Sequence, residues 1–421
     1  MFRFTRQQLH PIGVDIGHDS VKMLQLEIRP DRLVVHATGR RMLETGADGA
    51  ALGAGDLISM QASQAIRELL QGGNFAGRAA VVSLPRSIVH VKNLRLPLMP
   101  AGDLASVIQF EARESFPFDT QDAHVDYLVA GEIRQGTDVR QEVVVLAAQN
   151  GDVDRFVEQL HKTGLVIDSL DVEPCALYRT VDRFVRRRED EQEVHVIIDI
   201  GTRCTQVLIG KGRDVSFFKA IEIGGADFNS AVSRKLSIRF EEARALRRRL
   251  WDQDDADRPD TVRNAVLDAT RSVMENLAKE ISLCLRYHSV TFRGQRPLKV
   301  RAGGGEGGDP QLLGILNSVL SLPVEPARPL FSVDTASMRN FERLTPSGDW
   351  AVAMGLAMRR APGKYAPLDG TPRAAQVQIM AQANAAAQAN AAAQADQAAK
   401  AAAQQAAPPP TQPPIRELAH A

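Results

Sequence analysis

The sequence contains two short stretches with the same pattern, almost half the chain apart. In the first, an apolar run ends in Asp15-Ile16-Gly17, and in the second, another ends in Asp199-Ile200-Gly201. Each is followed by a short polar turn and a second strand-like run. Glycine permits a sharp turn and brings backbone N–H groups close to a ligand. Because one stretch opens each half of the chain, we predict a duplicated α/β domain that holds a nucleotide phosphate chain between its halves.

Length and composition exclude several classes of protein. A chain of 421 residues can form two or more cores, and its formal net charge of zero favours neither nucleic acid nor an anionic membrane. No run reaches the ~18–20 apolar residues of a membrane span, and no apolar signal core follows the basic N-terminus. Three widely separated cysteines, Cys175, Cys204 and Cys284, indicate a reducing compartment. We therefore expect a cytoplasmic protein with no nucleic-acid partner.

The pattern of strands and helices supports the duplication. Antiparallel strands are expected at residues 12–15, 21–27 and 33–41, and corresponding strands at residues 194–200, 206–210 and 215–223. Between these groups, residues 85–148 combine three strands with one helix in a βαββ-like order. Arginine runs at residues 186–188 and 247–249 have acidic neighbours and no interleaved aromatic residues, so we interpret them as solvated surface.

Asp15 and Asp199 are candidate ligands of a metal ion. Mg²⁺ prefers oxygen ligands and commonly bridges one or two carboxylates to nucleotide phosphates. Either aspartate alone could simply cap a turn, but two at corresponding places favour the metal. Lys22, seven residues after Asp15, could reach a phosphate as a point charge or could be a solvated strand lysine.

Glycine clusters and one glutamate are further candidates. Gly224-Gly225 and Gly303-Gly304-Gly305 each lie between a strand and a helix, where N–H groups can bind anions or simply serve the loop. Glu173 precedes a helix that begins at Pro174. It could orient an attacking water, or it could simply be an acid that the helix dipole stabilises at this end of the helix. No P-loop motif occurs, and the formal GxGxxG at residues 303–308 lacks the acidic residue of a dinucleotide fold.

In this order, the motifs resemble the actin-like ATPase fold and, more specifically, the PilM family of type IV pilus assembly proteins. The resemblance extends from about His10 to Arg360. Further stretches that are similar to the family are Asn93–Met99, Glu111–Asp119, Asp171–Pro174, Glu280-Ile281, Leu285-Arg286-Tyr287 and Ala353–Arg359.

The resemblance implies ATP and Mg²⁺ held between two lobes. Asp15 and Asp199 match the metal and phosphate aspartates, Glu173 matches a glutamate that positions water, and Glu280 lies on a helix that contacts the nucleoside. The expected cofactor-binding residues are Asp15, Gly17, Lys22, Asp199, Gly201, Thr202, Gly224, Gly225, Glu280, Gly303, Gly304 and Gly305.

It also implies a domain organisation with duplicated actin-like (ribonuclease H-like) lobes and an inserted α+β subdomain, to which composition adds a tail that is not part of the family pattern. The expected segments are residues 1–84 as the first part of lobe I, 85–165 as a partner-binding subdomain, 166–192 as the rest of lobe I, 193–361 as lobe II, and 362–421 as a disordered tail. The tail is rich in Ala, Gln and Pro and lacks an apolar face that could pack on a core.

Members of the PilM family lie at the cytoplasmic face of the inner membrane and bind the N-terminal peptide of the single-pass protein PilN. The resemblance therefore implies an ATP-binding adaptor that is peripheral to the membrane through its partners, with the pilus motor ATPases and self-association as further expectations. His18, Arg203 and Cys204 stand in the two turns where the family has smaller residues. These differences bring nucleotide turnover into question more than nucleotide binding. The alternatives are a structural scaffold without nucleotide turnover and a small-molecule kinase of the same fold.

Overall fold

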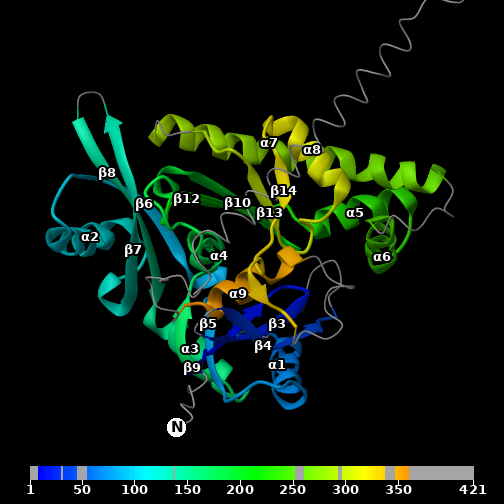
Figure 1. The fold of residues 1–421 in the computed structure, drawn as a ribbon, viewed down its shortest axis with the longest axis horizontal. Coiled ribbons are helices and arrows are strands. Elements are labelled where there is room, and N and C mark those ends of the chain that lie inside the picture. Colours follow the sequence, from blue (N-terminus) through cyan, green and yellow to red (C-terminus); the bar gives the residue numbers. More distant parts are fainter. Residues whose placement is uncertain are drawn as a thin grey trace, which may run out of the picture. The chain divides into compact units, whose positions relative to one another are not determined.

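A computed structural model describes residues 8–29, 32–44, 55–135, 138–251, 260–292, 296–336 and 347–359. These residues form three β-sheets, with helices packed around and between them (Figure 1). The expected tail at residues 362–421 lies outside the described residues.

The first sheet contains the N-terminal hairpin. Its strand order is β15-β4-β3-β2-β5-β9, with β1 beside β3. The pairs β2–β3 and β3–β4 are antiparallel, as predicted, whereas β5 and β9 continue the sheet in parallel. Its strands are β1 (Gln8–Leu9), β2 (Ile12–Ile16), β3 (Ser20–Ile28), β4 (Leu33–Met42), β5 (Ala79–Ser83), β9 (Val166–Asp171) and β15 (Val333–Asp334).

The second sheet repeats this arrangement. Its order is β12-β11-β10-β13-β14, with antiparallel pairs from β10 to β12 and parallel pairs from β10 to β14. Strands β10, β11, β12, β13 and β14 thus correspond to β2, β3, β4, β5 and β9, which confirms the predicted duplication. The strands of this sheet are β10 (Val194–Ile200), β11 (Thr205–Lys211), β12 (Asp214–Ile221), β13 (Val300–Gly303) and β14 (Val324–Pro326).

The third sheet has the order β6-β8-β7 and carries one helix, so the predicted βαββ order is confirmed. Its elements are β6 (His90–Pro97), α2 (Ala101–Ser115), β7 (Ala123–Gln135) and β8 (Asp138–Gln149). One face packs against Leu104, Ile108 and Ala112 of α2, because these residues lie four positions apart on one side of the helix. Strand β7 also contacts β12 and a helix of the second half.

The remaining helices cover the two larger sheets. Helices α1 and α3 pack on the first sheet through residues such as Ile66 and Phe156, and α5, α7 and α8 pack on the second through residues such as Phe228, Leu277 and Leu312. No helix among the described residues is long and apolar enough to cross a membrane. The helices are α1 (Met60–Gly72), α3 (Asn150–His161), α4 (Glu173–Asp182), α5 (Gly225–Leu236), α6 (Phe240–Trp251), α7 (Asp260–Phe292), α8 (Pro310–Leu320) and α9 (Ala351–Ala357).

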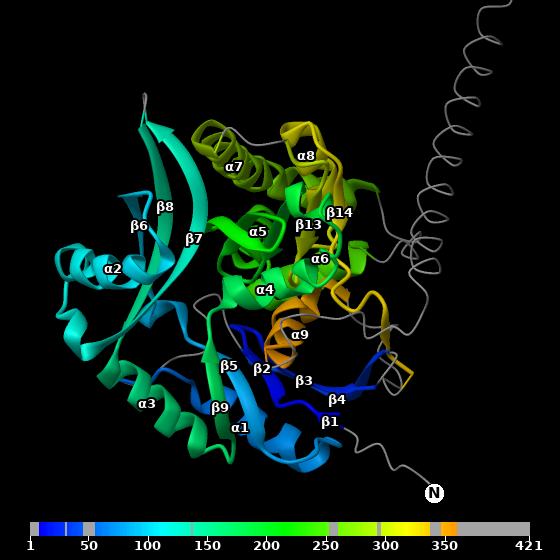
Figure 2. The same cartoon turned by 60° about the vertical axis from the view of Figure 1, so that its left-hand side comes forward.

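Helices α4 and α9 lie between the two larger sheets (Figures 1 and 2). They approach each other closely because Gly355 of α9 has no side chain: a Cβ there would lie 1.8 Å from the carbonyl oxygen of Ala176 in α4. A Cβ on Gly13 of β2 would likewise lie 2.2 Å from the carbonyl oxygen of Ala353. Within the family-like run at residues 353–359, Ala353 and Gly355 therefore lie at close backbone contacts between the sheets.

Candidate functional site

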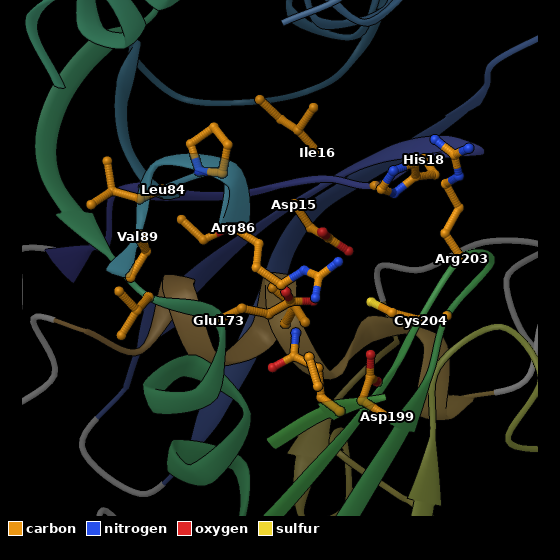
Figure 3. Close-up of a pocket in the computed structure, with 18 of the residues that line it drawn as sticks. Asp15, Ile16, His18, Leu84, Arg86, Val89, Glu173, Asp199, Arg203 and Cys204 are labelled. Atoms are coloured by element: carbon orange, nitrogen blue, oxygen red, sulfur yellow. The ribbon is translucent and has the colours of Figure 1, made fainter. Parts of the chain in front are cut away.

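The two Asp-Ile-Gly turns meet at one cavity of about 1020 Å³. Asp15 and Asp199 both line it, together with Glu173 at the start of α4. Figure 3 shows these carboxyl groups directed into the same space. Of the other residues expected at the site, Gly17, Lys22, Gly201, Thr202, Gly304 and Gly305 also line the cavity.

The two turns are closed by the same hydrogen bond. The N–H of Gly17 donates to the carbonyl oxygen of Ser20, and that of Gly201 donates to the carbonyl oxygen of Cys204, each at 3.0 Å. A Cβ on either glycine would lie 3.1 Å from the accepting oxygen. These glycines therefore hold each aspartate at the end of its strand.

Lys22 has two carboxylate partners in the wall of the cavity. It pairs with Asp15 across strands β2 and β3, and its Nζ lies 3.1 Å from Asp15 Oδ2 and 3.2 Å from Asp349 Oδ1. Arg40 binds the other oxygen of Asp349 at 2.7 Å. Burial opposes the charge on Lys22, but Asp15 and Asp349 more than offset it and raise the pKa of this lysine. Lys22 therefore orients Asp15 in this structure.

Negative charge is crowded among the acids of the cavity. Burial and the nearby charge of Asp15 raise the pKa of Glu173 to about 7, although Gln206, Lys22 and Arg86 oppose this. Burial, Glu173 and Asp15 raise the pKa of Asp199 well above its ordinary value. A bound cation would relieve this repulsion.

The donor set fits a partly hydrated Mg²⁺. Asp15 and Asp199 supply carboxylate oxygens, the ligands that Mg²⁺ prefers, and Mg²⁺ usually keeps several waters. Within the described ranges, no three His, Cys, Asp or Glu side chains are grouped closely enough to enclose a metal ion without such waters. These residues thus suit a metal ion that also binds a ligand, and they do not suit a structural metal centre in which protein side chains supply every ligand.

The stability of the ligand-free protein should depend on pH through Glu173. Because its pKa rises from 4.5 to about 7 on folding, the folded state binds more protons between those values. The free energy of unfolding is therefore expected to fall as the pH rises through this window. Urea unfolding at a series of pH values should show a shallower dependence for Glu173→Gln. Parallel curves for the variant and the wild type would contradict the raised pKa.

Three basic side chains, His18, Arg86 and Arg203, line the exposed part of the same cavity, and we call them the basic trio. Figure 3 shows His18 beside Arg203. Burial, Arg203 and Arg86 lower the pKa of His18, which places the three groups within electrostatic reach of one another. Burial raises the pKa of the Cys204 thiol to about 11, so this neighbour is neutral. The cavity therefore combines a buried acidic group with an exposed basic one.

The Gly303–Gly305 cluster turns beside Asp199. Gly304 has φ +79°, and a Cβ there would lie 2.4 Å from the carbonyl oxygen of Ile200. A Cβ on Gly303 would lie 3.3 Å from Asp199 Oδ1. The absence of side chains thus lets this loop approach the second turn.

Gly224 and Gly225 support the second turn from outside the cavity lining. The N–H of Gly225 donates to the carbonyl oxygen of Gly201 at 3.0 Å, and that of Gly224 donates to Asp227 Oδ2 at 2.9 Å. Glu280 of α7 is also outside the lining; its Oε2 lies 3.4 Å from Nζ of Lys219, which does line the cavity. The nucleotide contacts expected for these three residues stay predictions.

Sequence reasoning missed Asp349, Arg86 and a buried network behind the glycine loop. The interpretation of Arg247 as solvated surface is wrong, because it is 3% exposed. Its Nη2 lies 2.7 Å from Glu306 Oε2 and 2.9 Å from Asp309 Oδ2. The available signal was its spacing of four residues from Ala243, which lies on the buried face of α6.

Two sheets of matching strand order, each supplying an Asp-Ile-Gly turn to a shared cavity, define an actin-like ATPase fold. The chain belongs to the family of type IV pilus assembly proteins PilM, whose family model matches residues 13–361.

Three solved structures show a similar fold over most of this chain. The PilM–PilN type IV pilus biogenesis complex matches at a TM-score of 0.67 and 23% identity, over 83% of this chain and 98% of that chain. The ethanolamine utilization protein EutJ from Carboxydothermus hydrogenoformans matches at 0.48 and 13% identity, over 83% and 89% of the two chains. An archaeal actin homologue in complex with ADP matches at 0.40 and 15% identity, over 83% and 98%. Comparison with curated proteins gives no match.

Proposed function

We propose that this protein binds Mg-ATP in the cavity and acts as an adaptor in type IV pilus assembly. The observation that carries the proposal is the separation of charge in the cavity. The acids Asp15, Glu173 and Asp199 are suited to a hydrated cation. In the exposed basic trio, the two arginines supply positive charge for phosphate oxygens and His18 supplies a neutral hydrogen-bonding group. A magnesium-bound triphosphate requires both kinds of partner.

The acids and the lysine of the cavity would have different roles. Asp15 and Asp199 would hold Mg²⁺ through its waters, and the ion would offset the charge of the phosphates. Lys22 holds Asp15 in place through its 3.1 Å contact. Glu173, with a pKa of about 7, can accept a proton from a water near neutral pH. We propose slow or absent hydrolysis, because the adaptor role requires binding and not turnover.

The proposed partner is the N-terminal cytoplasmic peptide of a PilN-like single-pass inner-membrane protein. Membership of the PilM family and the likeness to the PilM–PilN complex support it. We assign the peptide to the segment at residues 85–165, which contains the third sheet. Strand β7 of that sheet contacts β12 and α7. A nucleotide-dependent movement of the second half of the protein would therefore be transmitted to the third sheet. The protein would thereby lie at the cytoplasmic face of the inner membrane.

Peptide capture tests this function. A synthetic peptide of the N-terminal cytoplasmic residues of the neighbouring single-pass membrane protein is immobilised, and the full chain is applied with Mg-ATP, with Mg-ADP or without nucleotide. We expect specific capture, with an affinity that depends on Mg-ATP, since binding at coupled sites is reciprocal. A scrambled peptide is the control. Equal retention on both peptides would reject the partner assignment.

A scaffold that does not use nucleotide is the second candidate. It is favoured by two ion pairs that already join the halves of the protein: Arg86 with Glu222, and Arg244 with Asp19 at 3.0 Å. Calorimetric titration of Mg-ATP into the full chain separates the two functions. Peptide capture without any heat of nucleotide binding would favour the scaffold.

A further inference from the structure

We propose that Arg86 recognises the terminal phosphate of the bound nucleotide, and that Glu222 holds its guanidinium until that phosphate arrives. This inference rests on the proposed binding of Mg-ATP and adds a residue that distinguishes ATP from ADP.

Arg86 and Glu222 face each other from the two halves of the protein. Arg86 begins the 3₁₀ turn Arg86–Ile88 after β5, and Glu222 follows β12. Two parallel hydrogen bonds join them, from Nη1 to Oε1 at 2.5 Å and from Nη2 to Oε2 at 3.0 Å. The arginine thus presents to a carboxylate the planar pair of donors that also fits a phosphate.

The ion pair is exposed enough to be exchanged. The side chains of Arg86 and Glu222 are 48% and 69% exposed. Water and salt screen an exposed pair of this kind, although its two parallel hydrogen bonds make it stronger than a surface pair with a single contact. A terminal phosphate carries more charge than one carboxylate and offers the same two-oxygen geometry, so it competes well for the guanidinium.

The position of Arg86 indicates which phosphate it would meet. Figure 3 shows the side chains of Arg86, Asp15 and Glu173 converging in the cavity. Arg86 opposes the rise in the pKa of Glu173, so the two groups are within electrostatic reach. Glu173 is the residue proposed to orient water toward the terminal phosphate. Arg86 therefore lies at that end of the triphosphate.

A consequence is that ADP leaves the Arg86–Glu222 pair intact, whereas ATP breaks it. The two residues should then affect ATP binding in opposite directions, because removing Arg86 deletes a contact and removing Glu222 deletes a competitor. If the pair merely joined the two halves of the protein, either substitution would break the same contact and both would act alike.

The test is calorimetric titration of Mg-ATP and Mg-ADP into the full chain for the wild type, Arg86→Gln and Glu222→Gln. We expect Arg86→Gln to weaken ATP binding about tenfold and ADP binding less than about twofold, as for loss of a charged hydrogen bond. Glu222→Gln should tighten ATP binding about two- to threefold. Arg41→Gln is the matched control, since Arg41 is an exposed arginine that pairs with Glu68 at 3.4 Å outside the cavity.

The outcomes are distinguishable. If both substitutions shift ATP affinity in the same direction, or if Arg86→Gln weakens ATP and ADP equally, the inference is overturned while nucleotide binding stands. If the wild type binds neither nucleotide, the proposed function itself fails. Thermal melts of the variants accompany the titrations, and the opposite sign expected for Glu222→Gln remains a test even if Arg86→Gln melts early.

Discussion

Asp199→Asn is expected to weaken Mg-ATP binding about tenfold to a hundredfold, the usual cost of losing a carboxylate that holds a metal ion through its bound waters. The same change should stabilise the ligand-free protein by about 1 kcal/mol. Both effects have one cause: Asp199 is buried beside Glu173 and Asp15, which raise its pKa, so its negative charge is costly without a cation. Asparagine keeps the shape of the side chain and removes the charge.

Calorimetry of Mg-ATP binding and urea unfolding of the ligand-free chain measure the two effects separately. Asp268→Asn is the control, because it makes the same chemical change at an exposed position of α7. Undiminished affinity in Asp199→Asn would remove Asp199 from the proposed metal site. A loss of stability would show that the buried charge is already compensated in the absence of a ligand.

Gly355→Ala should lower the free energy of unfolding by about 3 kcal/mol or more, at the upper end of overpacking effects. The added Cβ would lie 1.8 Å from the carbonyl oxygen of Ala176, which belongs to the backbone of α4 and cannot move aside by changing a rotamer. The helices would have to separate between the two larger sheets. Urea unfolding of the full chain provides the measurement.

Gly314→Ala supplies the comparison, because it is the same substitution in α8 with no atom within 4 Å of the new Cβ. It should leave the protein as stable as the wild type or stabilise it by up to about 1 kcal/mol, since alanine favours helix over glycine. Similar unfolding midpoints for Gly355→Ala and Gly314→Ala would contradict the close contact between α4 and α9.

Local sequence pattern was sufficient to predict the repeated hairpins and the βαββ segment. Each depends on alternation, turn glycines and short-range spacing, which are visible in a single sequence. The repeated Asp-Ile-Gly turns also predicted one shared cavity, because equivalent strands of a duplicated fold end at equivalent places. The cavity lined by Asp15 and Asp199 agrees with that reasoning.

Contacts between distant segments could not be predicted in this way. Asp349 reaches Lys22 from a 3₁₀ turn, Ser347–Trp350, near the end of the described chain, and no local pattern links the two. The pairing of Arg86 with Glu222 depends equally on how the two halves face each other. Arg247 was misinterpreted because a buried arginine needs several acceptors, and here Glu306 and Asp309 come from another segment.

The duplication leaves the cavity with nearly equivalent backbone on its two sides, so a ligand could in principle enter in either of two orientations. Lys22 and Gln206 make the two orientations unequal. They occupy matching places, opposite Asp15 and Asp199 in their respective strand pairs, but one is cationic and the other neutral. This difference is one of those that make the charges on the two sides of the cavity unequal, so the two ends of the site are not equivalent.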